Sequence, residues 1–171
     1  TSHIKPSSPL YGLRSNLLDT LVIPESRGNY NIAFGGKEPL IHGKRLTECT
    51  INEVLDWQRD RRSSPISGDT RAAGKFQIIE PTLRTTVAQL HLTGNELFDE
   101  KTQDMLGLKL AKGRGLDDYL AGKIDTAQMM LNLSKEWAGL PMDMSGKSYY
   151  GGVGLNRHKA GIEPEQIIAA L

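Results

Sequence analysis

The chain has 171 residues, a formal net charge of +1 and 24% charged residues. This length corresponds to one domain with a sizeable core, and the near-neutral charge argues against a dedicated nucleic-acid binder, which is usually clearly basic. The single cysteine, Cys49, excludes an internal disulfide framework, and no apolar run reaches the roughly 18 residues that a membrane span needs.

The front of the chain is predicted to hold a flexible lead-in, a buried helix and a small β lobe. Residues 1–9 are rich in proline and serine, lack the apolar stretch of a signal peptide, and predict a flexible lead-in to a single domain over residues 10–171. Leucines recur at spacings of three and four over residues 10–22, which predicts a helix that Pro24 ends. Residues 26–40 combine turn formers with β-prone pieces and predict an irregular β lobe.

Helices are predicted for most of the remaining chain, because capping residues, prolines and glycines mark their ends. The predicted helices are 50–61, with Thr50 and Glu53 as a capping box; one starting near Pro81; one capped by Asp99 and ending at residues 113–115; one capped by Asp125 and stopping before Pro141; and 164–171.

Glu25, in residues 24–31, is the strongest candidate for chemistry. A carboxyl group at the end of an apolar helix is partly desolvated, and desolvation favours the protonated form. An acid that keeps its proton near neutral pH can protonate a leaving oxygen. The plain alternative is a solvent-facing glutamate at a helix end, which is a common arrangement.

Two later segments have residue types suited to a sugar. In residues 70–79 small side chains permit close approach to the backbone, and Gln77 offers both a donor and an acceptor, which hydroxyl and acetamide groups need. Tyr149 and Tyr150 precede two glycines, and their aromatic faces could stack on sugar rings. The alternatives are an ordinary turn and strand for the first segment and simple packing for the second; Trp137 is expected to be a core residue.

These segments, in this order, resemble the phage lysozyme-like glycan-cleaving enzymes of the lambda endolysin type. The similarity runs from about Leu17 to Gly152 and includes ESRGNYN, the AFGG turn, His42, TRAAGKFQII, ELFD followed by QD at residues 96–104, and SKEWAGLP. The resemblance implies a lysozyme-like α+β fold, mostly helical, with a small β lobe and a glycan-binding cleft between the lobes.

The resemblance further implies that Glu25 acts as general acid and then as general base. It would protonate the glycosidic oxygen between N-acetylmuramic acid and N-acetylglucosamine in peptidoglycan and then activate the muramyl 6-hydroxyl. This lytic transglycosylase route needs one carboxylate, whereas hydrolysis usually uses two, and neither Asp69 nor Glu48 lies in an assignable motif. The residues expected to bind substrate are Ser26, Asn29, Tyr30, Gly74, Lys75, Phe76, Gln77, Tyr149 and Tyr150.

Three other functions stay open. A hydrolytic muramidase would use the same acid, and a virion component with a lysozyme-like fold would have no activity. A peptidoglycan endopeptidase or amidase would need Cys49 as a nucleophile or a zinc ion with clustered ligands. The four histidines, His3, His42, His91 and His158, are isolated in the sequence, so no metal and no cofactor is expected.

The expected partner is the glycan strand of bacterial peptidoglycan, and the expected place of action is the periplasm or cell wall of the host. Because the sequence shows no signal peptide, access would come from a membrane-permeabilising partner such as a holin, from carriage in the virion, or from a segment absent from this chain. The basic clusters 59–62 and 157–159 are expected to be solvated surface charge rather than a nucleic-acid site. A monomer is expected.

Overall fold

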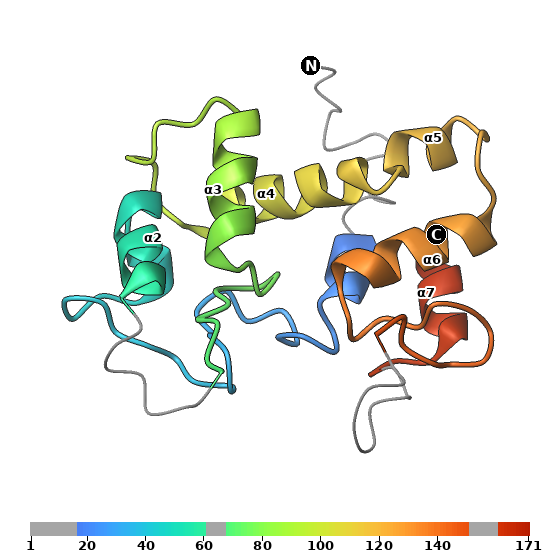
Figure 1. Cartoon of the computed structure of the whole chain (residues 1–171), viewed down its shortest axis with the longest axis horizontal. Helices are drawn as coiled ribbons and strands as arrows, with labels where there is room; N and C mark the ends of the chain where they lie inside the picture. Colours follow the sequence, from blue (N-terminus) through green and yellow to red (C-terminus); the bar gives the residue numbers. More distant parts are fainter. Residues whose placement is uncertain (1–16, 61–67, 151–160) are drawn as a thin grey trace. The chain divides into compact units, whose positions relative to one another are not determined.

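The computed structural model describes residues 17–60, 68–150 and 161–171, and these are mostly helical (Figure 1). Contacts divide the chain into two compact units. We call residues Thr1–Glu25 with Leu110–Leu171 the terminal unit, and residues Ser26–Lys109 the central unit. The predicted lead-in and the part of the first predicted helix before residue 17 lie outside the described residues, and a single domain over residues 10–171 stays a prediction.

The helices of the central unit are η1 (Leu46–Glu48), α2 (Ile51–Arg59), α3 (Glu80–Gln89) and most of α4 (Glu100–Gly113). The last three begin where the sequence predicts, whereas η1 was not predicted. At the start of α2 the Glu53 N–H donates to Thr50 Oγ1 at 3.1 Å, and the Thr50 N–H donates to Glu53 Oε1 at 3.0 Å. Pro81 stands in the first turn of α3, and Asp99 Oδ1 accepts the N–H of Thr102. These contacts confirm the predicted caps.

The predicted β lobe is a set of isolated bridges, and the described residues of the chain contain no longer strand. Ala33 bridges Ala73, and Ala73 bridges Ile78. Gly74 and Gln77 have φ angles of 79° and 48°, in the left-handed region. Left-handed residues at such short intervals turn the chain before it can extend, so turns take the place of a sheet.

The core of the central unit is built on α2, which packs against α3. Phe76 is 2% exposed, and its ring lies so close to Gly107 that a Cβ there would come within 2.4 Å of it. Other buried apolar side chains of this unit are Leu46, Ile51, Val54, Leu83, Phe98 and Leu106.

The terminal unit is helical. It contains the helical residues 17–21, α5 (Leu116–Leu120), α6 (Thr126–Glu136) and α7 (Pro164–Ala170), and α6 packs against both α5 and α7. The first of these helices ends before Pro24, and Asp125 Oδ1 accepts the N–H of Gln128 at 2.8 Å, both as predicted. The short helix α5, which starts after Gly115 at φ 99°, was not predicted.

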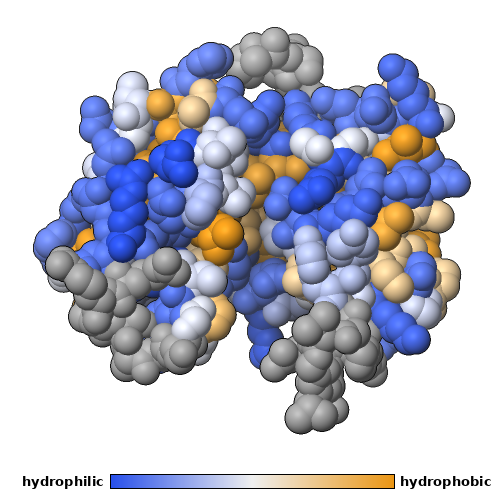
Figure 2. Space-filling model, in the orientation of Figure 1, coloured by the Kyte–Doolittle hydropathy of each residue, from blue (hydrophilic) through white to orange (hydrophobic). Residues whose placement is uncertain are grey.

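One face of the molecule is mainly polar (Figure 2). On the face shown in Figure 2 hydrophilic residues predominate, and hydrophobic residues reach the surface as separate small patches. Among the described residues no helix has both the length and the apolar character needed to cross a membrane.

Candidate active site

Glu25 lies in the turn that follows the helical residues 17–21, and its side chain is partly exposed. Its backbone N–H donates to the carbonyl of Val22 at 3.1 Å, which closes the turn after the helix. Its Oε1 accepts the N–H of Gly139 at 3.1 Å, and Gly139 belongs to the SKEWAGLP motif. The structure therefore brings the Glu25 side chain of ESRGNYN and the backbone of SKEWAGLP into direct contact within the terminal unit.

Two glycines approach the Pro24–Glu25 turn too closely to carry side chains. A Cβ on Gly139 would lie 2.7 Å and 2.8 Å from Pro24 Cβ and Cγ and 3.1 Å from Glu25 Oε1. A Cβ on Gly161 would lie 2.5 Å from Pro24 Cβ, and the Gly161 N–H donates to the Gly139 carbonyl at 2.8 Å. Sequence reasoning gave neither glycine a role; the high glycine content was the available signal. Together they hold the turn that carries the carboxylate.

Ser26, predicted to bind substrate, uses its hydroxyl inside the central unit. The side chain is 4% exposed, its Oγ donates to the Lys75 carbonyl at 2.5 Å, and the same Oγ accepts the Gly28 N–H at 3.2 Å. Asn29 is partly exposed, and its Oδ1 accepts the Asn31 N–H at 2.8 Å. In this arrangement Ser26 shapes the backbone, while Asn29 stays within reach of solvent.

Lys75 and Tyr30 form a charged cluster with Asp104. Lys75 Nζ lies 3.2 Å from Asp104 Oδ1, donates to Tyr30 Oη at 3.1 Å, and belongs to a side chain that is only 5% exposed. Tyr30 Oη donates to both Asp104 oxygens at 2.9 Å. Burial is the main cause that raises the pKa of Tyr30, so its hydroxyl keeps its proton at neutral pH. The sequence had marked the QD motif that contains Asp104 without assigning it a role.

The turn over residues 74–77 is held in place by contacts with Gln103 and with neighbouring backbone carbonyls. A Cβ on Gly74 would lie 2.3 Å from Gln103 Oε1. Gln77 is partly exposed, and its Nε2 donates to the carbonyls of Ile32 and Gly74 at 3.2 Å and 2.9 Å. Phe76, expected to contact substrate, instead fills the core beside Gly107. Gln77 is thus the residue of this turn with its side chain nearest to solvent.

Tyr149 and Tyr150 are exposed by 45% and 53% and form an edge-to-face pair with ring centroids 5.0 Å apart. Tyr150 Oη donates to the Lys135 carbonyl at 2.7 Å, and Lys135 Nζ lies 5.4 Å from the Tyr149 ring centroid. These contacts orient both rings while leaving aromatic surface exposed. The glycines that follow, at 151 and 152, lie outside the described residues.

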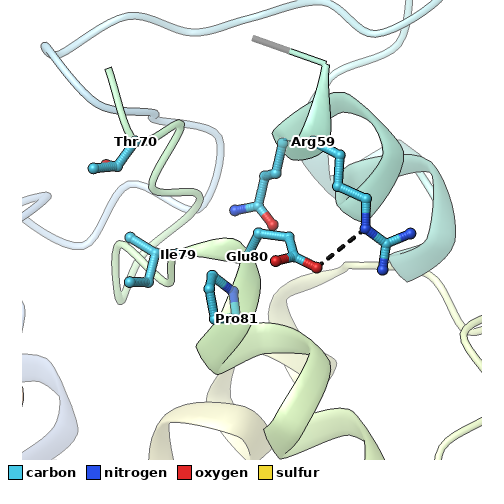
Figure 3. Close-up of a pocket in the computed structure, with 6 residues that line it drawn as sticks. Arg59, Thr70, Ile79, Glu80 and Pro81 are labelled. Carbon is cyan, nitrogen blue, oxygen red and sulfur yellow. Dashed lines mark hydrogen bonds and ion pairs between the residues drawn. The ribbon is translucent and has the colours of Figure 1, made fainter. Parts of the chain in front are cut away.

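A pocket of about 330 Å³ lies in the central unit between the end of α2 and the start of α3 (Figure 3). Gln58 Nε2 donates to the carbonyls of Arg71 and Ile78, and its buried Oε1 has no hydrogen-bond partner among the described residues. Arg59 Nε pairs with Glu80 Oε1 at 3.1 Å across the pocket wall (Figure 3). The pocket is lined by Gln58, Arg59, Thr70, Ile79, Glu80 and Pro81, and none of these is a predicted site residue.

Among the described residues, those considered for cysteine or zinc chemistry are not arranged for it. Cys49 is fully buried, and burial raises the pKa of its thiol, which disfavours the reactive thiolate. In the described part of the chain no group of three or more His, Cys, Asp and Glu side chains could hold a metal ion. His42 and His91 are exposed residues with left-handed φ angles, and His3 and His158 lie outside the described residues.

Comparison with known proteins agrees with this fold. The family model described as Endolysin matches residues 16–156. A solved structure of bacteriophage lambda lysozyme complexed with a chitohexasaccharide is similar with a TM-score of 0.60 and 21% sequence identity, over 99% of this chain and 97% of that chain. No curated protein sequence matches the chain. The structural likeness confirms the lysozyme-like, mostly helical fold that the sequence predicted.

Proposed function

The chain belongs to the endolysin family of phage peptidoglycan-degrading enzymes, and from this premise we propose that it is a lytic transglycosylase with Glu25 as its general acid and base. The single observation that carries this assignment is the environment of the Glu25 carboxyl group. Its Oε1 is held by the Gly139 N–H at 3.1 Å, in a turn that leaves no room for a side chain at Gly139.

In the proposed reaction, protonated Glu25 donates its proton to the glycosidic oxygen between N-acetylmuramic acid and N-acetylglucosamine. The bond between the muramyl C1 and that oxygen breaks, leaving an oxocarbenium-like centre at C1. The Glu25 carboxylate then removes the proton of the muramyl 6-hydroxyl, whose oxygen bonds to C1 and gives the 1,6-anhydro product. One carboxyl group serves as acid and then as base, and no water is consumed.

The other two carboxylates considered for hydrolysis have structural roles. Asp69 Oδ1 accepts the Arg71 N–H at 2.7 Å and so closes a turn, and Glu48 Oε1 pairs with Arg45 Nε at 2.7 Å on the surface. A hydrolytic mechanism normally needs a second carboxylate free to activate water or to attack the sugar. Because both carboxylates already form these contacts, we favour transglycosylation over the muramidase alternative.

For the substrate we propose a division of roles among the predicted binding residues. Asn29, Tyr30 and Gln77 of the central unit are partly exposed, and Tyr149 and Tyr150 of the terminal unit are exposed, so each of these side chains is accessible to a glycan. The members of the predicted set that are buried support them: Ser26, Gly74, Lys75 and Phe76. The chitohexasaccharide bound to lambda lysozyme supports a glycan as the ligand. Access to the wall through a holin or a virion, and the monomeric state, stay predictions.

Digestion of purified peptidoglycan tests the proposal. The wild-type chain should release muropeptides one water lighter at the muramyl end, whereas Glu25→Gln should release none because the amide cannot donate the proton. Glu48→Gln, a surface glutamate, is the matched control and should digest normally. Mass spectrometry of the fragments separates the alternatives. Reducing muramyl ends would indicate hydrolysis, and intact glycan with cut stem peptides would indicate a peptidase or amidase. A wild-type chain without any activity would indicate a virion component.

A further inference from the structure

Gln103 and Asp104 are consecutive residues of α4 and make up the QD motif, to which the proposed reaction gives no task. We propose that the pair positions the catalytic acid: it holds the acid-flanking segment, residues 26–31, and the 74–77 turn in one fixed arrangement. This inference rests on the proposed role of Glu25. Every hydrogen bond and ion pair that supports it lies within the central unit, and Glu25 precedes the first residue of that unit in the chain.

Gln103 is 1% exposed, and both the oxygen and the nitrogen of its side-chain amide form hydrogen bonds. Its Oε1 accepts the Lys75 N–H at 2.9 Å, and its Nε2 donates to the carbonyls of Tyr30 at 3.0 Å and of Phe98 at 2.9 Å. If the amide were rotated by 180°, its NH₂ would face the Lys75 N–H and its oxygen would face the two carbonyls. The three hydrogen bonds therefore determine its orientation. One buried side chain thus joins three backbone segments that are remote in sequence.

Asp104 holds the same two residues through their side chains. Its carboxylate accepts the Tyr30 hydroxyl at 2.9 Å and lies 3.2 Å from the Lys75 ammonium. The Lys75 side chain is 5% exposed, and the Asp104 carboxylate supplies a counter-charge to its ammonium. Tyr30 is therefore anchored at its carbonyl by Gln103 and at its hydroxyl by Asp104.

From Lys75 the connection reaches Glu25 in two steps. The Lys75 carbonyl accepts the Ser26 hydroxyl at 2.5 Å, and Ser26 is bonded directly to Glu25 in the chain. The backbone of Lys75 is fixed on its other side by Gln103. Both ends of residues 26–30 are consequently tied to α4, one through Lys75 and one through Tyr30. Acid catalysis is sensitive to such placement, since a displacement of about 1 Å can cost about a hundredfold in rate.

The test compares turnover with local backbone protection. Gln103→Met removes the three hydrogen bonds at similar side-chain length, and Asp104→Asn is the milder variant, because the Asp104 side chain is 41% exposed and its amide still accepts a hydrogen bond. The control is Glu53→Gln in the same unit. It breaks the Lys44 ion pair that helps to hold the pKa of Glu53 at about 2. The hydrogen bonds of the Glu53 side chain go to Lys44 and Thr50, away from residues 26–31 and 74–77. The substrate is soluble, uncrosslinked glycan strands from peptidoglycan.

We expect Gln103→Met to lower kcat at least about tenfold with KM nearly unchanged, Asp104→Asn to lower kcat by a smaller factor, and Glu53→Gln to keep the wild-type kcat. Amide hydrogen exchange at Gly28, Asn29 and Lys75 should accelerate in Gln103→Met and not in Glu53→Gln. The inference would be overturned if Gln103→Met raised KM instead of lowering kcat, or if Glu53→Gln lost as much kcat. Wild-type kcat in both α4 variants would also overturn it.

The Glu25→Gln variant, measured alongside, separates this inference from the function on which it rests. If Glu25→Gln is inactive while Gln103→Met and Asp104→Asn turn over normally, the proposed function stands and the positioning role fails. If Glu25→Gln is fully active, the proposed function fails, and the positioning of that acid fails with it.

Discussion

Gly139 controls the surroundings of Glu25 at the scale of a single residue. Its N–H donates to the carboxylate, and the absence of a side chain lets Pro24 pack against it. Its φ angle is not in the left-handed region, so glycine is needed here for space rather than for backbone conformation. Any side chain at this position must displace the Pro24–Glu25 turn.

We predict that Gly139→Ala lowers the rate of peptidoglycan cleavage by about ten- to a hundredfold, because a Cβ 2.7 Å from Pro24 Cβ forces the turn to move. Gly113→Ala is the matched control, since a Cβ at Gly113 meets no heavy atom within 4 Å. Release of soluble fragments and thermal unfolding would be measured for both variants. Wild-type cleavage by Gly139→Ala would mean that the turn tolerates the shift.

A second prediction at the scale of one residue concerns how Glu136 makes the stability of the protein depend on pH. It lies 3.5 Å from Arg114, yet burial outweighs that ion pair and raises the pKa of Glu136. With a pKa higher in the folded than in the unfolded state, its contribution favours folding at low pH and is lost as pH rises through the folded pKa. Glu136→Gln should therefore raise Tm at pH 7, and the gain should vanish below about pH 4, where the glutamate is protonated in both states.

Thermal unfolding of wild type and Glu136→Gln from about pH 3.5 to 7.5 checks this prediction. Asp118→Asn on α5, an exposed acid, is the control for the loss of one negative charge. A Tm at pH 7 lower in Glu136→Gln than in wild type would show that the ion pair with Arg114 outweighs the cost of burial.

At the scale of elements, the turn over residues 71–78 depends on α2. Gln58 projects from α2 and donates to the carbonyls at both ends of the turn, Arg71 at 2.9 Å and Ile78 at 2.8 Å. The same turn contains left-handed Arg71 and Gln77, conformations that cost energy outside glycine. The helix thus supplies the hydrogen bonds that keep a strained turn in place.

We predict that Gln58→Met destabilises the protein by about 1–3 kcal/mol, since the Arg71 carbonyl loses its Gln58 donor while the Ile78 carbonyl still accepts the Ala73 N–H. Gln89→Met, at an exposed position of α3, should change stability by less than about 0.5 kcal/mol. Urea unfolding followed by circular dichroism measures both. Equal stabilities of the two variants would mean that water replaces the lost donors.

The elements also show which parts of the fold are predictable. The starts of α2, α3, α4 and α6 were predicted correctly because each cap is a contact between residues three apart or a proline in the first turn. The five-residue helix α5 was missed because one turn and a half has too short an apolar pattern to detect. The small β lobe takes the form of isolated bridges, since β-prone residues cannot extend where left-handed residues intervene.

For the whole molecule, α4 connects the two compact units. The boundary between them falls after Lys109, inside a continuous helix that runs from Glu100 to Gly113. Unfolding of either unit would therefore unfold part of α4. Because helix formation is cooperative, the rest of α4, which belongs to the other unit, would be destabilised as well. This connection favours unfolding of the chain as one unit.

We predict a single calorimetric unfolding transition, with the calorimetric enthalpy equal to the van't Hoff enthalpy. Leu133→Ala in the terminal unit and Leu83→Ala in the central unit, both at fully buried leucines, should each shift the whole transition to lower temperature. Two resolved transitions, with only one displaced by each substitution, would show that the units unfold independently.

The sequence by itself determined the helices with strong caps, the motif that contains Glu25 and the family to which these motifs belong. These features depend on side chains a few residues apart, or on ordered motifs that can be recognised without coordinates. The sequence could not show that Phe76 would be buried, or that Asp104 would pair with Lys75.

Only the tertiary structure decided how the acid and its neighbours are held. Glu25 meets Gly139 across 114 residues, Ser26 meets Lys75 across 49, and Tyr30 meets Asp104 across 74. Spacing along the chain carries no information about pairs so far apart. For Ser26 and Lys75 burial decides the pairing, because buried polar groups nearly always have a hydrogen-bond partner, wherever in the sequence that partner lies.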